Sequence, residues 1–403
     1  MQYELIIPDE ADVDSLCGQK ILPPFSDVTL AFVEAVSSRI LKDASFRQFP
    51  EIMAAAFWMR KANMVRLKTT FEKQRGNRLW IGRGLVFHIA PANVDTLFLY
   101  SWFLSMLVGN TNIARLSRTS NPQIDSLLVV ISHVINQEEF SEICSRNMIV
   151  RYDHDEMTTS FFSDRCNMRV IWGGDETIRR IRAIPIPARA IELTFADRFS
   201  FSLIRAEAFL SSDSKEALVN DIYNDAYWFE QNACSSPRLV VWLGDADAVE
   251  RTRTLFWRMF EALVVEKQPP CAPSTAADKL NTECSVVIAS RGKPVIEKTD
   301  SSRLNRVLLN DSRDINRDVH RGGGMFYEYT ISNLEELAEL IAPKDQTIGV
   351  FGFEHGELKE LFANSLPHGV DRIVPIGQAL NFSNVWDGHD LLREFCREIE
   401  ITA

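Results

Sequence analysis

Short runs of apolar, often β-branched residues recur between about residues 80 and 205, and a helical pattern separates each run from the next. Strands that are apolar throughout are typical of a parallel sheet that helices cover on both faces. We therefore predict a doubly wound α/β domain in this region. The predicted strands are 84–90, 112–117, 147–152 and 168–172, and the predicted helices are 94–108, 122–136, 156–165 and 176–184.

A second alternation of the same kind begins near Phe199, and the first 75 residues have a helical pattern. The segment 266–283 is rich in proline and polar residues, which predicts a long surface loop. We expect domains at 1–200 and 201–368, and a C-terminal segment, 369–403, that returns to the first domain or to an oligomer interface. The predicted elements after 200 are strands at 238–244, 284–289, 305–309, 327–331, 346–353 and 372–377, and helices at 216–229, 247–265, 333–342, 356–365 and from about 389.

Composition excludes several classes of protein. The net charge of −11 disfavours binding to nucleic acid, which relies on a basic face. The seven cysteines never occur as C-x-x-C, and the histidines form no H-E-x-x-H, so we expect neither a disulfide framework nor a metal site. The longest apolar stretch, 96–108, is shorter than the roughly 20 residues that cross a bilayer, which predicts a buried helix in a cytoplasmic protein.

Individual residues suggest chemistry, although each has an ordinary structural explanation. Gly173-Gly174 follows a predicted strand, where glycine lets the backbone approach a phosphate, but G-x-G-x-x-G is absent and a simple turn explains it equally well. Cys234 lies in a segment of small and polar residues before a predicted strand. A reactive thiolate and a structural cysteine are both compatible with this position. Asn93 follows the first strand, where its amide can stabilise an oxyanion or cap the next helix.

Together these segments resemble the aldehyde dehydrogenase superfamily. GLVFHIAPANVD is similar to the segment whose Pro-x-Asn supplies an oxyanion-hole amide, and LVGNTNIARLSR to G-N-T-x-x-x-K-P-S. VIWGGDETI is similar to F-T-G-S-x-x-x-G, and FEQNACSS to the F-x-Q-x-x-C that carries the nucleophile. WGGDE, QNACSSPR and GVDRIVPIGQALNFSNVWDGHDLL further resemble the LuxC-type acyl-CoA reductases. The resemblance implies catalytic Cys234 and Asn93, and cofactor-binding Ala90, Pro91, Arg115, Ser117, Gly173 and Gly174.

The resemblance also implies a fold and an activity. The fold would be aldehyde dehydrogenase-like, with an NADP-binding domain within 1–200, a catalytic domain at 201–368 and the active site between them. The activity would be NADPH-dependent reduction of a long-chain acyl thioester to the aldehyde through acyl-Cys234. The acyl donor would be acyl-CoA, an acyl carrier protein or an acyl-protein synthetase, and the chain would form a homo-oligomer.

Three positions carry open alternatives. Glu192 keeps the glutamate of the superfamily's E-L-G-G without its glycines, so it is a vestige, a proton shuttle or a solvated strand residue. His320 falls where a ribose-binding glutamate is expected, or simply belongs to a glycine-rich turn. Arg115 is a cation that favours a 2′-phosphate, and hence NADPH, or an arginine whose stem packs on the sheet.

Other functions compete with the reductase. An acylating aldehyde dehydrogenase working in the oxidising direction would use the same residues. A thioesterase or acyltransferase would need a base near Cys234, and no histidine adjacent in sequence supplies one. A non-catalytic subunit that binds acyl-carrying partners would have no need of Cys234, so labelling of this thiol by an electrophile discriminates it.

Overall fold

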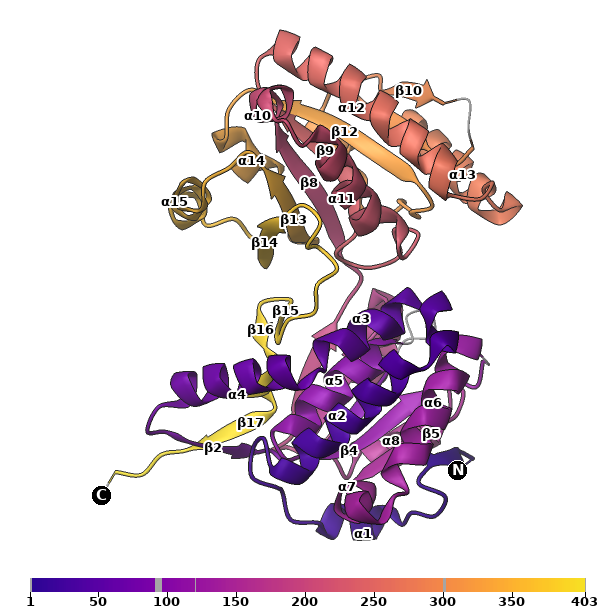
Figure 1. The fold of residues 1–403 in the computed structure, drawn as a ribbon, viewed down its shortest axis with the longest axis vertical. Coiled ribbons are helices and arrows are strands. Elements are labelled where there is room, and N and C mark those ends of the chain that lie inside the picture. Colours follow the sequence, from indigo (N-terminus) through magenta and orange to yellow (C-terminus); the bar gives the residue numbers. More distant parts are fainter. Residues whose placement is uncertain (1, 91–95, 120, 300–301, 403) are drawn as a thin grey trace. The chain divides into compact units, whose positions relative to one another are not determined.

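The computed structural model describes residues 2–90, 96–119, 121–299 and 302–402, and the chain folds as two α/β units. Unit 1 consists of residues 1–197 together with 382–403, and unit 2 of residues 198–381. The boundaries predicted at 200 and 368 compare with 197 and 381. The C-terminal segment thus belongs to unit 1, where strand β17 (Cys396–Ile399) pairs antiparallel with β2 (Leu79–Gly82), as Figure 1 shows.

The main sheet of unit 1 has the strand order β1-β5-β4-β3-β6-β7. Strands β3 to β7 run parallel, and β1 joins the edge antiparallel to β5. The two strands at 385–390 form a separate hairpin. The strands of unit 1 are β1 (Glu4–Ile7), β2, β3 (Leu85–Ile89), β4 (Thr111–Leu116), β5 (Asn147–Arg151), β6 (Met168–Trp172), β7 (Ile191–Phe195), β15 (Val385–Trp386), β16 (His389–Asp390) and β17.

Burial along β3 explains why its sequence is apolar throughout. Leu85, Phe87 and Ile89 enter one hydrophobic cluster, whereas Val86 enters another on the opposite face of the sheet. Helices therefore cover both faces, as predicted. The helices of unit 1 are α1 (Val13–Gly18), α2 (Asp27–Lys42), α3 (Pro50–Trp58), α4 (Lys61–Arg75), α5 (Thr96–Leu107), α6 (Pro122–Ile135), α7 (Ser141–Cys144), α8 (Glu156–Ser163), α9 (Asp175–Arg182) and α16 (Leu391–Glu394).

Helix α5 is the longest apolar stretch of the sequence, and it lies inside the protein. Its residues from Phe98 to Leu107 are buried, including Ser101 and Ser105. Among the described residues, no helix combines the length and the apolar character that crossing a membrane requires.

Unit 2 contains a sheet with the order β10-β11-β12-β9-β8-β13-β14. Its strands run parallel except β10, which joins the edge antiparallel to β11. Along β9, Val240 and Trp242 face one hydrophobic cluster, and Leu239 and Val241 face the other. The strands are β8 (Phe199–Arg205), β9 (Pro237–Leu243), β10 (Val295–Lys298), β11 (Asn305–Leu308), β12 (Met325–Ile331), β13 (Asp345–Phe351) and β14 (Arg372–Pro375).

The helices of unit 2 include one that the sequence analysis misassigned. Residues 266–283 were expected to form a loop and 284–289 a strand, but 273–289 form a helix, and most of the predicted loop belongs to it. A helix expected from about 389 is also wrong, since that segment contains the short α16 and the strand β17. The helices of unit 2 are α10 (Ala206–Ser211), α11 (Lys215–Tyr227), α12 (Ala246–Lys267), α13 (Pro273–Ala289), α14 (Glu335–Leu340) and α15 (His355–Ser365).

Candidate active site

Cys234 lies in the segment between α11 and β9, at the amino edge of the unit 2 sheet. Its side chain is half-buried, whereas the following Ser235 and Ser236 are buried. The segment bends sharply, because Glu230 and Gln231 have φ values of +49° and +59°. Left-handed backbone at non-glycine residues is costly and persists only where the surroundings hold it, which is common at functional sites.

Gln231 supplies much of that support. Its side chain is fully buried, and its Nε2 donates to the carbonyls of Pro237 and Met325, both at 2.9 Å. Its Oε1 accepts from the N–H groups of Gly324, at 2.8 Å, and Met325, at 3.1 Å. Because these partners begin β9 and end the turn before β12, Gln231 fixes the nucleophile segment to two strands of the sheet.

The turn before β12 has room only for glycine. Gly324 has φ +83°, and a Cβ there would lie 2.1 Å from the Arg303 carbonyl oxygen. Gly322 has φ +76°, and the N–H of Gly323 donates to the Glu230 carbonyl at 2.9 Å. The glycine-rich turn that the sequence analysis singled out therefore packs directly against the nucleophile segment.

Ser200, at the start of β8, contacts the peptide of the candidate nucleophile. Its Oγ donates to the Cys234 carbonyl at 2.6 Å and accepts from the Thr347 N–H at 3.1 Å. Ser200 is buried, so water does not compete strongly for these hydrogen bonds. The sequence signal for this role is a serine that alternates with phenylalanine in the run FSFSL.

His320 belongs to the same group of residues. Its Nδ1 accepts from the Gly322 N–H and its Nε2 donates to the Met325 carbonyl, each at 3.1 Å, so the neutral ring has its proton on Nε2. Burial, and then the charge of Arg238, hold the pKa of His320 well below its usual range. Both ring nitrogens therefore have partners inside unit 2. The predicted contact between His320 and a ribose is not tested by this geometry and stays a prediction.

Arg238 was not identified from the sequence. Its guanidinium is buried and donates from Nε and Nη2 to the Gln231 carbonyl, at 3.3 and 3.2 Å. These bonds hold the peptide that follows the left-handed Gln231. They also place a buried positive charge next to the backbone that leads to Cys234.

Asp225, in the last turn of α11, is a further buried group. Its carboxylate accepts from the N–H groups of Gly377, at 2.7 Å, and Ala379, at 3.1 Å. Burial raises the pKa of Asp225 to about 7 against the opposing effect of these bonds. The contact links α11 to the PIGQAL segment, which was part of the resemblance described above.

Apart from His320 and Pro91, the predicted cofactor residues lie in unit 1, at the carboxyl edge of its parallel sheet. Ligands of open α/β sheets bind at this edge. A pocket of about 360 Å³ opens there, next to the ends of β3, β4 and β5. Ala90 is buried and donates its N–H to the Arg115 carbonyl at 3.1 Å. Pro91 and the predicted oxyanion donor Asn93 lie outside the described residues.

Arg115 lines this pocket but is itself largely enclosed. Its Nε and Nη2 donate to the Tyr152 carbonyl at 3.1 and 2.9 Å, and its Nη1 reaches the Ala90 carbonyl at 3.5 Å. The guanidinium also lies 5.2 Å from the centre of the Tyr152 ring. The arginine stem packs on the sheet, as one of the two interpretations expected, but the head binds carbonyls instead of reaching water.

The other predicted cofactor residues lie on neighbouring loops. Ser117 accepts from the Thr119 N–H at 3.2 Å, and Gly173 donates its N–H to the Phe195 carbonyl at 3.1 Å. Gly174 is exposed and precedes α9 without a capping side chain. The first N–H groups of α9 thus have no capping side chain, an arrangement that suits a phosphate. The cofactor roles of these residues stay predictions.

Glu192 lies away from that edge. It is the second residue of β7 and pairs in register with Arg169, the second residue of β6, so it lies toward the amino ends of the strands. The buried Arg169 binds one carboxylate oxygen, and Arg182 approaches the other at 3.1 Å. These ion pairs give Glu192 a structural role. The contacts do not test its predicted catalytic role, which stays a prediction.

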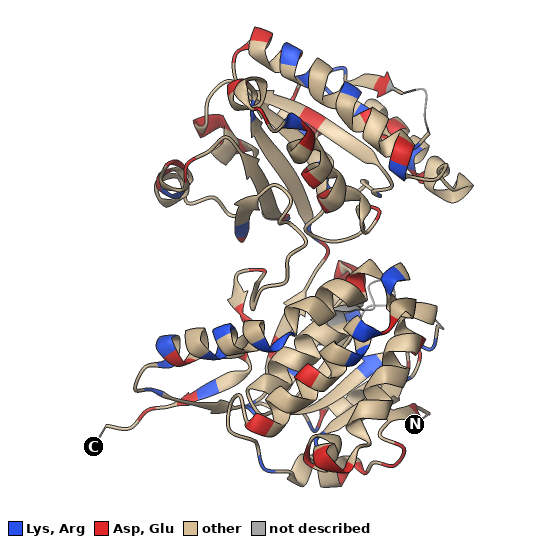
Figure 2. Ribbon diagram, in the orientation of Figure 1, with Lys and Arg blue, Asp and Glu red and all other residues tan. Residues whose placement is uncertain are grey.

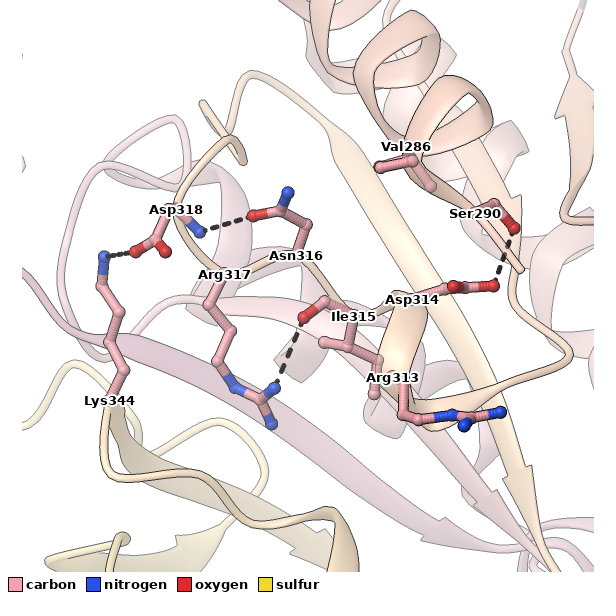
Figure 3. Close-up of a pocket in the computed structure, with 10 residues that line it drawn as sticks. Val286, Ser290, Arg313, Asp314, Ile315, Asn316, Arg317, Asp318 and Lys344 are labelled. Carbon is pink, nitrogen blue, oxygen red and sulfur yellow. Dashed lines mark hydrogen bonds and ion pairs between the residues drawn. The ribbon is translucent and has the colours of Figure 1, made fainter. Parts of the chain in front are cut away.

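A smaller pocket, of about 270 Å³, lies in unit 2 and is shown in Figure 3. Each cation that lines it is paired with a carboxylate: Arg313 with Asp311, Arg317 with Asp345 and Lys344 with Asp318. Because these charges are already paired within the protein, the pocket offers no unpaired cation to an anionic ligand. Within the described ranges, no cluster of His, Cys, Asp and Glu could hold a metal ion.

Comparison with protein families matches residues 62–398 to the acyl-CoA reductase (LuxC) model. A curated relative, the long-chain acyl-protein thioester reductase of Aliivibrio fischeri, is 25% identical over 320 residues. This match covers 77% of this chain and 61% of the relative, so the chain spans less than two thirds of the relative's length.

Solved structures confirm the predicted fold. A putative aldehyde dehydrogenase from Burkholderia cenocepacia is 12% identical with a TM-score of 0.65, over 92% of this chain and 83% of that one. Aldehyde dehydrogenase 21 from Physcomitrella patens is 10% identical with a TM-score of 0.66, over 96% and 86% of the two chains. At these identities the comparison establishes the fold alone.

Proposed function

The chain belongs to the acyl-CoA reductase (LuxC) family, and we propose that it reduces a long-chain acyl thioester to the aldehyde with NADPH, through a covalent acyl-Cys234 intermediate. The observation that carries the proposal is the Cys234 segment. It presents a half-buried thiol shortly after two left-handed residues. Hydrogen bonds from Gln231, Ser200 and Arg238 hold the backbone of this segment.

The Cys234 thiolate would attack the carbonyl carbon of the acyl thioester, and the carrier thiolate would leave. This forms a new thioester on Cys234 and frees the carrier, which takes a proton from solvent. The hydrogen bond from Ser200 to the Cys234 carbonyl supports the position of the nucleophile during the attack. In the proposal, Asn93 donates to the oxyanion, and one such donor is typically worth about 3 kcal/mol.

The carboxyl edge of unit 1 fits a dinucleotide. It combines the exposed Gly174 before α9 with a pocket lined by Arg115 and Arg180. NADPH bound there would supply the hydride that reduces the acyl carbon. The thioester carbonyl carbon on Cys234 would then lose its bond to sulfur, which would release the aldehyde and regenerate the thiolate. Since the acyl group leaves as aldehyde, the reaction needs no hydrolytic water and no glutamate to activate one.

The name of the Aliivibrio fischeri relative supports an acyl protein as a donor besides acyl-CoA. The test therefore uses both donors. Purified protein is incubated with palmitoyl-CoA or with palmitoylated acyl carrier protein, without cofactor, and the Cys234 peptide is analysed by mass spectrometry. We expect a palmitoyl adduct on Cys234 that disappears, with release of hexadecanal, when NADPH is added.

Two variants make the test specific. Cys234→Ala should lose both the adduct and aldehyde formation, whereas Cys284→Ala, which removes an exposed cysteine of α13, should keep both. Running the assay with aldehyde, CoA and NADP measures the oxidising direction on the same residues. If no donor acylates Cys234, the reductase proposal fails and a non-catalytic acyl-binding subunit becomes the better hypothesis.

A further inference from the structure

The unit 1 pocket holds two kinds of cationic side chain that differ in what they already bind. It is lined by Arg115 and Tyr152 at the ends of β4 and β5, by residues around the start of α8, and by Thr177, Arg180 and Ile181 of α9. Arg115 is buried, and its guanidinium donates to the Tyr152 and Ala90 carbonyls. To bind a ligand phosphate, Arg115 would have to give up these buried hydrogen bonds.

Arg180 is placed differently. Its side chain is exposed, and its Nη2 donates to Nδ1 of the exposed His154 at 2.7 Å. Because Nδ1 accepts this bond, the neutral imidazole has its proton on Nε2, where it can be donated to a ligand. The guanidinium keeps its other N–H groups for a bidentate contact with phosphate oxygens.

Charges of both signs surround this pair, since Asp153, Asp155 and Glu156 line the pocket together with Arg115 and Arg180. Burial, then Arg180, then Arg115 lower the pKa of His154, while Asp153 opposes them. Asp155 is the N-cap of α8, where it accepts from the Met157 N–H at 3.1 Å and from the Thr158 hydroxyl at 2.5 Å. Arg180, in direct contact with His154, is therefore the lining cation placed to bind an anion together with this imidazole.

We propose that Arg180 and His154 bind the 2′-phosphate of NADPH and so determine the preference for NADPH over NADH. Arg115, which the sequence suggested for this task, instead holds the edge of the sheet in place. Asp153 acts against the phosphate, because its negative charge opposes those of Arg180 and Arg115 at His154. The inference rests on the proposed function, in that unit 1 must bind a nicotinamide dinucleotide.

The test measures binding without turnover. Isothermal titration of the full chain with 2′,5′-ADP and with 5′-AMP compares a ligand that has the 2′-phosphate with one that lacks it. We expect Arg180→Gln to weaken 2′,5′-ADP binding by roughly tenfold to a hundredfold, the range of a lost charge-assisted contact, and to leave 5′-AMP binding unchanged. Arg179→Gln is the matched control, since Arg179 directly precedes Arg180 in α9 and pairs with Glu176.

A second readout concerns protons. A bound 2′-phosphate would raise the pKa of His154, so near pH 6.5 the imidazole should take up protons when 2′,5′-ADP binds, in addition to the proton change of the phosphate itself. Titrations in buffers of different ionisation enthalpy detect this uptake, which should be lost in His154→Gln. Asp153→Asn should strengthen 2′,5′-ADP binding.

The outcomes separate this inference from the proposed function. If Arg180→Gln keeps the full preference for 2′,5′-ADP, the inference is overturned. If the wild-type chain binds 5′-AMP as well as or better than 2′,5′-ADP, the inference is overturned while a nicotinamide cofactor remains supported. If the wild-type chain binds neither nucleotide, nor NADPH or NADH, the proposed function fails together with the inference.

Discussion

Acidification should destabilise unit 1 through His88. This residue of β3 is completely buried, and its Nε2 donates to the Asn112 side-chain oxygen at 3.1 Å while its Nδ1 lies 3.0 Å from the Ser101 hydroxyl. The network continues from Asn112 to Asn147, which also accepts from the Trp102 indole N–H at 2.8 Å. It accommodates a neutral imidazole, and burial lowers the pKa of His88 to about 4.

The size of the effect follows from proton linkage. The folded-state pKa is depressed, so the stabilisation is complete above the unfolded-state pKa and is lost as the pH falls toward the folded-state value. In between, the unfolded chain binds a proton that the folded chain excludes. With pKa values of about 6.5 unfolded and about 4 folded, lowering the pH from 7 to 5 removes about 2 kcal/mol.

Hydrogen exchange of peptides from β3 and α5 measures the stability of unit 1 separately from that of unit 2. Between pH 7 and 5, the wild-type chain should lose about 2 kcal/mol more than His88→Gln, which cannot ionise. His133→Gln, at an exposed position near the end of α6, controls for the loss of a histidine and should behave as wild type. If wild type and His88→Gln lost the same free energy, the reasoning from buried neutral histidine would be refuted.

Three further predictions follow from unit 2. Ser200→Ala should slow acylation of Cys234 by roughly tenfold to a hundredfold without changing the KM for the acyl donor, and Ser200→Thr, which keeps the hydroxyl, should restore the rate. Equal acylation rates in Ser200→Ala and wild type would contradict a positioning role. Glu328→Leu should lower the free energy of unfolding of unit 2 by about 3 to 5 kcal/mol, because the buried carboxylate accepts hydrogen bonds from Arg253, Arg306 and two tryptophans. Glu297→Gln, which removes a surface partner of Arg306 at 3.9 Å, should lower it by under about 1 kcal/mol, and hydrogen exchange of β12 distinguishes the two variants. The raised pKa of Asp225, about 7, should make unit 2 lose about 2 kcal/mol as the pH rises from 5 to 7, and a slope that persists in Asp225→Asn would disprove this.

Local sequence was sufficient where a pattern reflects only a residue's nearest neighbours. Apolar strands separated by amphipathic helices predicted two α/β units, because a strand buried on both faces must be apolar at consecutive positions. A turn at the glycines after His320 was one of two alternatives from the sequence, and Gly322 and Gly324 have the left-handed backbone that favours this residue type. The local pattern left Cys234 open between a reactive and a structural cysteine, and the resemblance of its motif to a known family singled it out.

Helix α13 shows a signal that was present but misread. The apolar run at 284–289 suggested a strand, yet the buried positions are Lys279, Thr282, Glu283 and Val286, at helical spacing, while Ile288 is 84% exposed. Two of these buried positions are charged side chains whose burial depends on partners elsewhere in unit 2, as when Asn305 donates to Glu283 at 2.5 Å. Without those partners, the run of valine and isoleucine dominates the pattern.

What the sequence by itself determined is therefore the class of fold and most of its parallel strands, while the resemblance of its motifs supplied the candidate nucleophile. What only the tertiary structure decided is which polar group contacts which. Strand β17 pairs with β2 from the far end of the chain, Glu192 is paired with Arg169 through the register of β6 and β7, and Arg115 is enclosed by carbonyls. The physical reason is that hydrogen bonds and ion pairs depend on distances of a few ångströms between residues distant in sequence, whereas helices, strands and turns depend mainly on neighbours along the chain.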